Sequence, residues 1–140
     1  MVTLPAAVRR QVIARAAGYC EYCRASLAVV VEWEVDHIVP VAAGGDSSAD
    51  NLCAACAGCN RYKAAFQDGA DPDTGQTVPL FDPRRQRWDE HFAWDADGVS
   101  LTGRTPTGRA TVARLRMNRA RMLAARRLWV ATGLFPPRDG

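Results

Sequence analysis

Apolar residues near the N-terminus recur at helical spacing. Val8, Val12 and Ala16 follow one another every four residues, which places them on one face of a helix. The pattern predicts a helix over residues 3–17. Gly18 is typical of the residue at which such a helix ends, because glycine readily adopts the left-handed backbone conformation found there.

The next apolar stretch has the alternation of a strand. Residues 29–35 read VVVEWEV, and in the second half Trp33 and Val35 alternate with glutamates. This alternation is typical of a half-buried β-strand, so we expect Trp33 and Val35 to face the core. Pro40 then interrupts the apolar run, and Gly44 begins a loop.

A second helix is predicted over residues 57–67, where Asn60, Lys63 and Ala64 share a face. Residues 68–77 follow with little apolar content and many turn-forming residues. We expect this segment to be a turn-rich linker.

The C-terminal half shows a hairpin and a helix. Residues 91–95 and 99–103 have the composition of strands, and Ala-Asp-Gly at 96–98 is a hairpin signal between them. Residues 105–109 are expected to form a break and a helix cap. An apolar stripe over residues 118–132 predicts a final helix.

These elements together predict an α+β fold. Residues 1–67 form the expected core with its N-terminal helix, residues 68–77 the linker, and residues 78–140 an extension that packs on the core as one compact unit. His91 lies in a predicted strand, and we expect it to be structural. Four aromatic residues are expected to pack the hairpin against the last helix: Trp88, Phe92, Trp94 and Trp129.

Charge divides the chain unevenly. Residues 1–100 carry 9 Arg and Lys against 14 Asp and Glu, whereas residues 101–140 carry 9 Arg against the single Asp139. A cationic segment of this kind favours a polyanionic partner, most often nucleic acid. A solvated helix face in an arginine-rich proteome is the alternative. No apolar run reaches membrane-span length, and arginines interrupt the N-terminal apolar positions, so we expect no membrane partner, no export signal and a cytoplasmic location.

Four of the five cysteines fall into two Cys-x2-Cys pairs. The pairs are Cys20 with Cys23 and Cys56 with Cys59, and Cys53 is left over as a small core residue. Without an export signal, such pairs favour metal over disulfides. We expect a structural Zn²⁺ bound by four thiolates, a closed site that staples the fold. Free buried cysteines or a redox pair are the alternatives.

Potential catalytic residues lie close to the second cysteine pair. Asp36 and His37 end the predicted strand, Asn51 follows His37 by 14 residues, and Asn60 comes directly after Cys59. Taken alone, His37 would more often be a satisfied polar residue, and each asparagine could cap a turn or helix. Their combination in one order, held by the two cysteine pairs, favours a functional site.

As a set, these residues resemble the HNH endonuclease family, also called the ββα-metal nucleases. The cysteine-bearing branch has the pattern Cys-x2-Cys, Asp-His-Ile-x-Pro, Gly-Gly, Asn-Leu and Cys-x2-Cys-Asn-x2-Lys, and residues 18–66 contain every part. The resemblance implies a zinc-stapled ββα-metal core with a C-terminal hairpin-plus-helix extension. The family's final histidine is Asn60 here, which implies an oxygen ligand in place of imidazole.

The resemblance also implies roles. His37 would be the general base, since an imidazole with a pKa of about 6.5 is mostly neutral at pH 7. Asp36 and Asn60 would hold one catalytic cation, Mg²⁺ or Mn²⁺, with oxygen donors. Asn51 would orient His37 or brace the loop between the strands. Five basic residues are candidate nucleic-acid contacts: Arg61, Lys63, Arg116, Arg119 and Arg126. Arg119 and Arg126 are seven residues apart, and with Arg116 they are expected to form an exposed row that contacts phosphates.

We therefore predict a metal-dependent DNA endonuclease that hydrolyses phosphodiester bonds, with double-stranded DNA as the expected substrate. The alternative is a zinc-dependent nucleic-acid-binding module without catalysis. A nuclease domain cut from a larger, secreted toxin is a third and less favoured interpretation.

Overall fold

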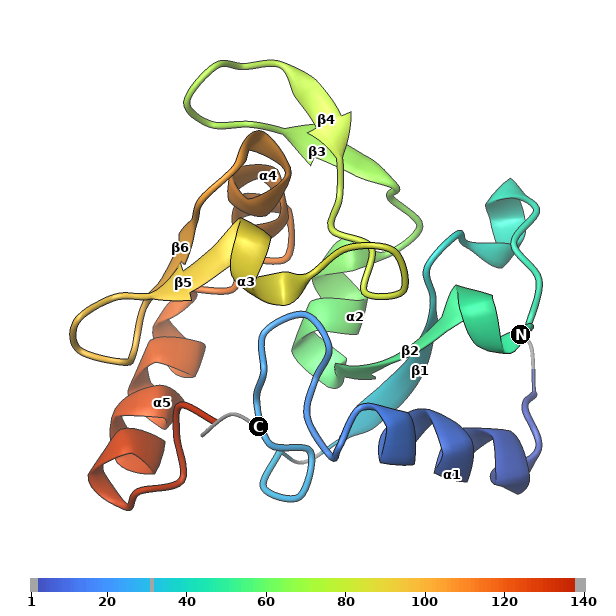
Figure 1. The fold of residues 1–140 in the computed structure, drawn as a ribbon, viewed down its shortest axis with the longest axis horizontal. Coiled ribbons are helices and arrows are strands. Elements are labelled where there is room, and N and C mark those ends of the chain that lie inside the picture. The colour runs from blue at the N-terminus through green and yellow to red at the C-terminus, as the bar shows by residue number, and fades with distance from the viewer. Residues whose placement is uncertain (1–2, 31, 138–140) are drawn as a thin grey trace.

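Two antiparallel strands and one helix form the centre of the molecule. The computed structural model of the chain describes residues 3–30 and 32–137. In it β1 (Trp33–His37) pairs along its whole length with β2 (Leu52–Cys56), and α2 (Ala57–Lys63) begins directly after β2. Figure 1 shows α2 lying beside this strand pair. The α+β fold and its ββα core are confirmed.

The predicted strand was placed too early in the chain. It covers residues 33–37 instead of 29–35, because Trp33 pairs with Cys56, the last residue of β2, and the described residues 29, 30 and 32 belong to no strand. Residue 31 lies outside the described residues. Trp33 and Val35 are half-buried against the core, whereas Asp36 is buried more deeply than either. The alternation therefore did not predict the most buried residue of β1.

The N-terminal helix α1 (Ala6–Arg15) buries Val12 and packs on β2. It is shorter than predicted at both ends. At its N-terminal end Pro5 is the cap and lies outside the helix. At its C-terminal end the chain leaves the helical conformation after Ala16, with φ of 55° at Ala17 and 81° at Gly18. The helix predicted over residues 57–67 is also shorter, since α2 ends at Lys63 and Ala64 has a φ of 49°.

The segment expected to be a linker is a hairpin. Residues 68–77 include β3 (Asp68–Ala70) and the start of β4 (Thr77–Pro79), which pair antiparallel. The turn between them is held by Asp71, whose carboxylate accepts hydrogen bonds from Arg109 Nε at 2.9 Å and Nη2 at 2.8 Å. The low apolar content of this segment suggested a linker. The turn is nevertheless ordered, because polar contacts hold it in place of apolar ones. The division of the chain at this segment stays a prediction.

The C-terminal half contains the predicted hairpin and final helix, with a further helix between them. After α3 (Trp88–His91), β5 (Phe92–Trp94) pairs with β6 (Leu101–Gly103), and α5 (Ala120–Ala131) is the last helix. His91 therefore ends a short helix and does not lie in a strand. The additional helix is α4 (Pro106–Arg114). Thr105 caps it by accepting a hydrogen bond from Gly108 N, so the expected break and cap begins this helix.

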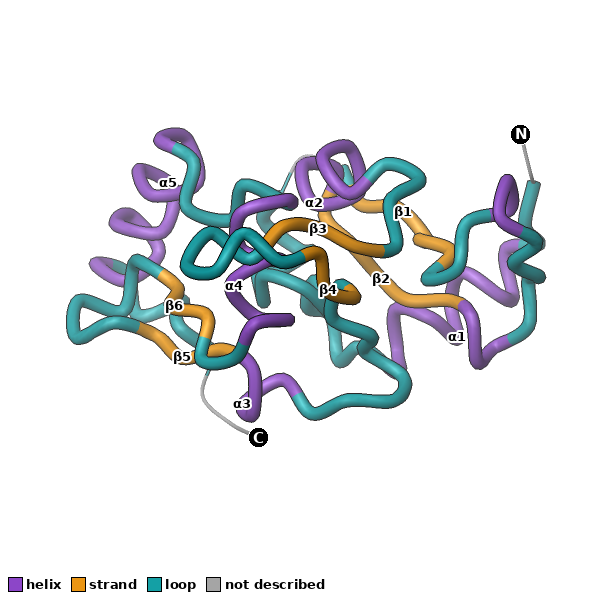
Figure 2. Tube along the Cα trace, turned by 90° about the horizontal axis from the view of Figure 1, so that it is seen from above, coloured by secondary structure: helices purple, strands orange, loops and turns teal. Residues whose placement is uncertain are grey.

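Aromatic side chains connect these elements as predicted. Trp94 and Trp129 both pack on Phe135, with ring centroids 4.6 and 5.6 Å away, and Phe92 packs against Trp88 at 5.2 Å. Figures 1 and 2 place α1, β1 and β2 at one end of the molecule and β5, β6 and α5 at the other. Among the described helices, none has the length and apolar character needed to cross a membrane.

The extension also contacts the first cysteine turn. Trp88 Nε1 donates a hydrogen bond to the Tyr22 carbonyl oxygen at 2.7 Å. Glu21, next to Cys20, accepts a hydrogen bond from Ala54 N at 2.8 Å and forms an ion pair with Arg84. These contacts connect the extension, the cysteine turn and β2.

Candidate metal centre and active site

The four paired cysteines form one buried group, hereafter the cysteine cluster. Their sulfur atoms all lie within 4.8 Å of one another, and Cys23 Sγ is 3.7 Å from Cys56 Sγ. A tetrahedral zinc site with Zn–S bonds of about 2.3 Å has sulfur–sulfur edges of about 3.8 Å. The cluster therefore has the dimensions of a structural metal site. Its members are Cys20, Cys23, Cys56 and Cys59.

Backbone groups and burial suit the cluster to a cation. Cys23 N donates to Cys20 Sγ, and Cys59 N donates to Cys56 Sγ, both at 3.4 Å. Burial raises the pKa of the Cys20 thiol well above its usual value, with further contributions from hydrogen bonding to the neighbouring cysteines. Thiolates at this position therefore require a metal ion to stabilise them.

Cys53 is separate from the cluster, as predicted. It lies on β2 and is fully buried, with its thiol 3.7 Å from Asp36 Oδ2. Burial raises the pKa of Cys53, and the Asp36 charge adds to that effect. This thiol is consequently a poor nucleophile.

Asp36 is buried and has protein partners on its carboxylate. Its exposed fraction is 5%, and its Oδ2 accepts a hydrogen bond from Tyr22 OH at 2.7 Å. Lys63 Nζ lies 3.2 Å from Oδ2 and 3.4 Å from Oδ1. Oδ1 has the longer contact, so it is the oxygen more available to another ligand.

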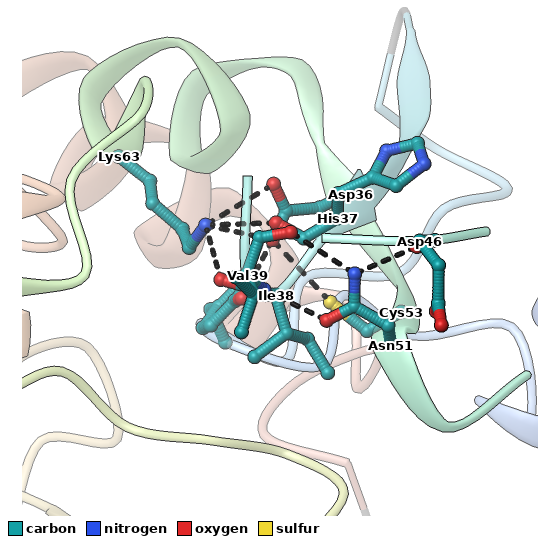
Figure 3. Close-up of polar contacts among 9 residues, drawn as sticks. Asp36, His37, Ile38, Val39, Asp46, Asn51, Cys53 and Lys63 are labelled. Carbon is teal, nitrogen blue, oxygen red and sulfur yellow. Dashed lines mark hydrogen bonds and ion pairs between the residues drawn. The ribbon is translucent and has the colours of Figure 1, made fainter. Parts of the chain in front are cut away.

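Lys63 is not the surface residue that phosphate binding would require. Its side chain is 2% exposed, and Nζ also donates to the carbonyl oxygens of His37 at 3.2 Å and Ile38 at 3.3 Å. Figure 3 shows this ammonium group surrounded by the Asp36 carboxylate and the two carbonyl groups. The expectation that Lys63 contacts phosphate is wrong, because the lysine is the buried counter-ion of Asp36.

His37 points to the other side of β1. Figure 3 shows its imidazole ring directed away from Lys63, and the residue is half-buried. Ser47 Oγ lies 3.0 Å from His37 Nε2. When Nε2 carries the ring proton, it donates to Ser47, and Nδ1 is then the nitrogen with a free lone pair.

Asn51 braces the loop between the strands. Its Oδ1 accepts from Val39 N at 2.8 Å, and its Nδ2 donates to Val39 O at 3.0 Å and Asp46 O at 2.8 Å. The loop leaves no room beside it, since a Cβ atom on Gly45 would lie 1.8 Å from Val39 O. Among the hydrogen bonds of the described residues, none joins Asn51 to the His37 ring. The structure thus favours the bracing role over a catalytic one.

Asn60 and Arg61 lie at the middle of α2. Asn60 is half-buried, and in the described part of the chain its side-chain amide forms no hydrogen bond, so its oxygen is free to accept a ligand. Arg61 is exposed and free to contact a phosphate group. The roles of Asn60 as a cation ligand and of Arg61 as a phosphate contact stay predictions.

The three candidate arginines of the C-terminal segment differ in environment. Arg116 is exposed and Arg119 half-buried, with guanidinium carbons 4.8 and 5.5 Å from the Tyr62 ring centroid. Arg126 is fully buried and therefore cannot contact DNA in this fold. It was expected on an exposed row because it lies seven residues after Arg119. Arg119, however, is the extended residue that precedes α5, so the two arginines do not share a helix face.

Two polar partners were not found from the sequence. Tyr22 lies inside the first Cys-x2-Cys turn and binds Asp36, and Ser47 lies in the loop and binds His37. The Cys-x2-Cys motif around Tyr22 could be recognised in the sequence. The motif did not indicate that the Tyr22 side chain points toward Asp36. Ser47 carried no signal, because serine is common in loops.

Two paired strands and a helix carry four clustered cysteines, with Asp36 and His37 on the first strand. Residues 20–66, about a third of the chain, match the family model described as HNH endonuclease. This match confirms the resemblance for residues 20–66. Comparisons of the chain with curated proteins and with solved structures find no match.

Proposed function

We propose that this protein is a metal-dependent endonuclease that hydrolyses phosphodiester bonds in DNA. The observation that carries the proposal is the HNH domain with Asp36, His37 and Asn60 all present on β1 and α2. The cysteine cluster fixes the start of α2, so it determines where Asn60 lies relative to β1. The resident structural ion is proposed to be Zn²⁺.

His37 is proposed to act as the general base. Ser47 fixes Nε2 of the ring, so Nδ1 is the atom that takes a proton from the attacking water. The ring is half-buried and the loop beside it is held by Asn51, which limits the positions that a substrate phosphate can occupy. Asn51 is thus assigned a positioning role.

Asp36 and Asn60 are proposed to hold the catalytic divalent cation. Their donors fit Mg²⁺ or Mn²⁺ in type, since both present oxygen atoms and the Asn60 amide forms no hydrogen bond among the described residues. When bound, the cation would neutralise charge on the scissile phosphate and stabilise the leaving oxygen. Lys63 would share the Asp36 carboxylate with it.

Nucleic acid is proposed to bind over α2 and α5. A groove of about 660 Å³ lies there, and its lining has no acidic residue. Arg61 and Arg121 are exposed along it, while Arg119 and Tyr62 contribute a cation–aromatic pair. Phosphate contacts of this kind supply affinity without sequence selection. Double-stranded DNA and a cytoplasmic location stay proposals.

One observation favours the alternative of a nucleic-acid-binding module without catalysis. Lys63 already neutralises Asp36 in the buried pair, so the carboxylate is less available to a cation than an exposed one. The two functions predict different outcomes in one experiment.

Supercoiled plasmid is incubated with the zinc-loaded protein and Mg²⁺ or Mn²⁺, and nicked and linear products are separated. The endonuclease proposal expects cleavage that requires added cation and is lost in His37→Ala. Plasmid retardation without cleavage, under both cations, would support the binding module. Cleavage of equal rate by His37→Ala and wild type would contradict the assignment of the base.

A further inference from the structure

Arg126 carries a permanent charge in the interior of the protein. It lies in the middle of α5 and is 0% exposed. Nη1 donates hydrogen bonds to Val99 O at 2.9 Å and to Asn118 Oδ1 at 3.2 Å. Nε and Nη2 are buried and have no hydrogen-bond partner within the described part of the chain. Two of its three guanidinium nitrogens thus have no hydrogen-bond acceptor among the described residues.

Within the described residues, no carboxylate forms an ion pair with this charge. The ion pairs among residues 3–30 and 32–137 use other basic residues, and none includes Arg126. Its two hydrogen-bonded oxygens are neutral amide oxygens, and the nearest aromatic ring, that of Trp94, has its centroid 5.5 Å from the guanidinium carbon. Burial of an uncompensated cation is strongly unfavourable, so an anion is expected close by.

The cysteine cluster is the neighbouring source of negative charge. Burial lowers the pKa of Arg126, and this effect is opposed chiefly by charges on Cys23 and Cys59. The packing of α5 agrees, because Met122, one turn before Arg126, lines a pocket together with Cys56. Arg126 therefore lies on the side of α5 that covers the cluster.

A metal-loaded cluster would require such a partner. One Zn²⁺ ion with four thiolates carries a net double negative charge. In a buried site that charge is stabilised by N–H donors and by cations near the sulfurs. The two backbone N–H groups that donate to Cys20 and Cys56 supply hydrogen bonds but no net charge.

We propose that Arg126 is the counter-cation of the metal-loaded cysteine cluster, with Nε and Nη2 donating to the thiolates of Cys23 and Cys59. The C-terminal extension then belongs to the metal site, since α5 supplies a buried positive charge beside the cluster. This role is independent of nuclease activity, and it holds for the non-catalytic alternative as well.

The test compares zinc retention in variants of the full-length, zinc-loaded chain. Arg126→Met removes the charge and keeps the length of the side chain, whereas Arg127→Met is the matched control on the exposed side of α5. Transfer of zinc to a chromophoric chelator is followed by absorbance. Loss of an outer partner of a metal ligand typically lowers metal affinity about 10- to 100-fold, which is the expected effect of Arg126→Met.

Two further variants separate charge from packing. Asn118→Ala removes one hydrogen-bond partner of Arg126 and keeps the cation, so zinc retention should stay close to wild type. Arg126→Lys keeps a charge with different donors. In the cobalt-substituted protein it should shift the sulfur-to-metal charge-transfer band and retain metal better than Arg126→Met. If Arg126→Met does not fold, the cobalt spectrum of Arg126→Lys decides alone.

The proposal is overturned when Arg126→Met holds zinc as tightly as Arg127→Met, or when Arg126→Lys leaves the cobalt spectrum unchanged. It is also overturned when Asn118→Ala releases zinc as fast as Arg126→Met, since packing would then account for the loss.

Discussion

Lys63 Nζ lies 3.2 Å from Asp36 Oδ2, and both side chains are almost completely buried, at 2% and 5% exposure. The pair joins the end of α2 to the residue before the proposed general base. Its ammonium group also binds the carbonyl oxygens of His37 and Ile38, so one side chain organises the backbone on both sides of His37.

Removing one partner of this pair should destabilise the protein strongly. Lys63→Met leaves Asp36 as a buried, unpaired carboxylate, and such changes cost about 3–5 kcal/mol. The free energy of unfolding is measured by urea denaturation of the zinc-loaded protein, with the exposed Arg61→Met as control. The double variant Lys63→Met, Asp36→Asn should recover part of the loss, because neither charge then remains. A loss below about 1 kcal/mol for Lys63→Met would show that the pair is not energetically coupled.

Asn51 offers a separate test of loop bracing. Asn51→Ala deletes three hydrogen bonds to the backbone of Val39 and Asp46, and unsatisfied buried groups typically cost about 1–3 kcal/mol each. We expect a lower midpoint of thermal unfolding and, in an active enzyme, a lower kcat because the loop carrying Ser47 shifts. Asp50→Ala, on an exposed neighbour, is the control. Catalytic loss without any change in thermal stability would instead indicate direct participation of Asn51.

These contacts show where prediction from the sequence ended. The two cysteine turns, the strand that ends with Asp-His and the final helix were predicted from the sequence. Each of these features depends on residues close together in the chain. The Lys63 ion pair joins residues 27 positions apart, and Asp71 meets Arg109 across 38. Spacing on a helix could not show which face of α2 would be buried. The prediction that Arg126 lies on an exposed row was wrong for the same reason, because packing between distant elements decides which residues are buried.

The Asp71–Arg109 contact makes stability depend on pH in a defined direction. The Arg109 guanidinium, through two hydrogen bonds, lowers the pKa of Asp71 to about 2. In the unfolded chain the pKa of Asp is about 3.9, so the folded carboxylate is the more acidic one. Its contribution is therefore full above about pH 4 and is lost as the pH falls through about 2. Asp71→Asn should lower the unfolding midpoint at pH 7, and the gap from wild type should close below about pH 4.

The exposed Asp73 provides the matched comparison, because it also pairs with Arg109, at 3.1 Å, but is 67% exposed. Asp73→Asn should have a much smaller effect at pH 7. An Asp71→Asn gap that is constant between pH 7 and pH 2 would contradict a charge-based contribution.

Metal removal should unfold the core. Chelation leaves four buried cysteines without their metal ion, and burial raises the pKa of Cys20, so its thiol is protonated at neutral pH. Metal retention should weaken as the pH falls, because protons compete for the same sulfurs. Circular dichroism after chelation follows the loss of structure. Cys53→Ala should keep a full zinc content, whereas Cys56→Ala should lose it, and equal zinc contents in the two variants would exclude the cluster as the binding site.

Asn60 separates the catalytic site from the metal staple. Its side-chain amide forms no hydrogen bond among the described residues, whereas its neighbour Cys59 is fully buried in the cysteine cluster. Asn60→Ala should therefore retain zinc and change the free energy of unfolding by less than about 0.5 kcal/mol, as is usual for a side chain without such contacts. Its plasmid cleavage should nevertheless fall steeply, and a higher Mg²⁺ or Mn²⁺ concentration should restore part of it, because a lost cation ligand weakens binding. Asn60→Asp, which keeps the oxygen donor, is expected to retain more activity than the alanine variant. Full activity in Asn60→Ala, or loss of zinc from it, would mean that the oxygen donor and the staple are not separate sites.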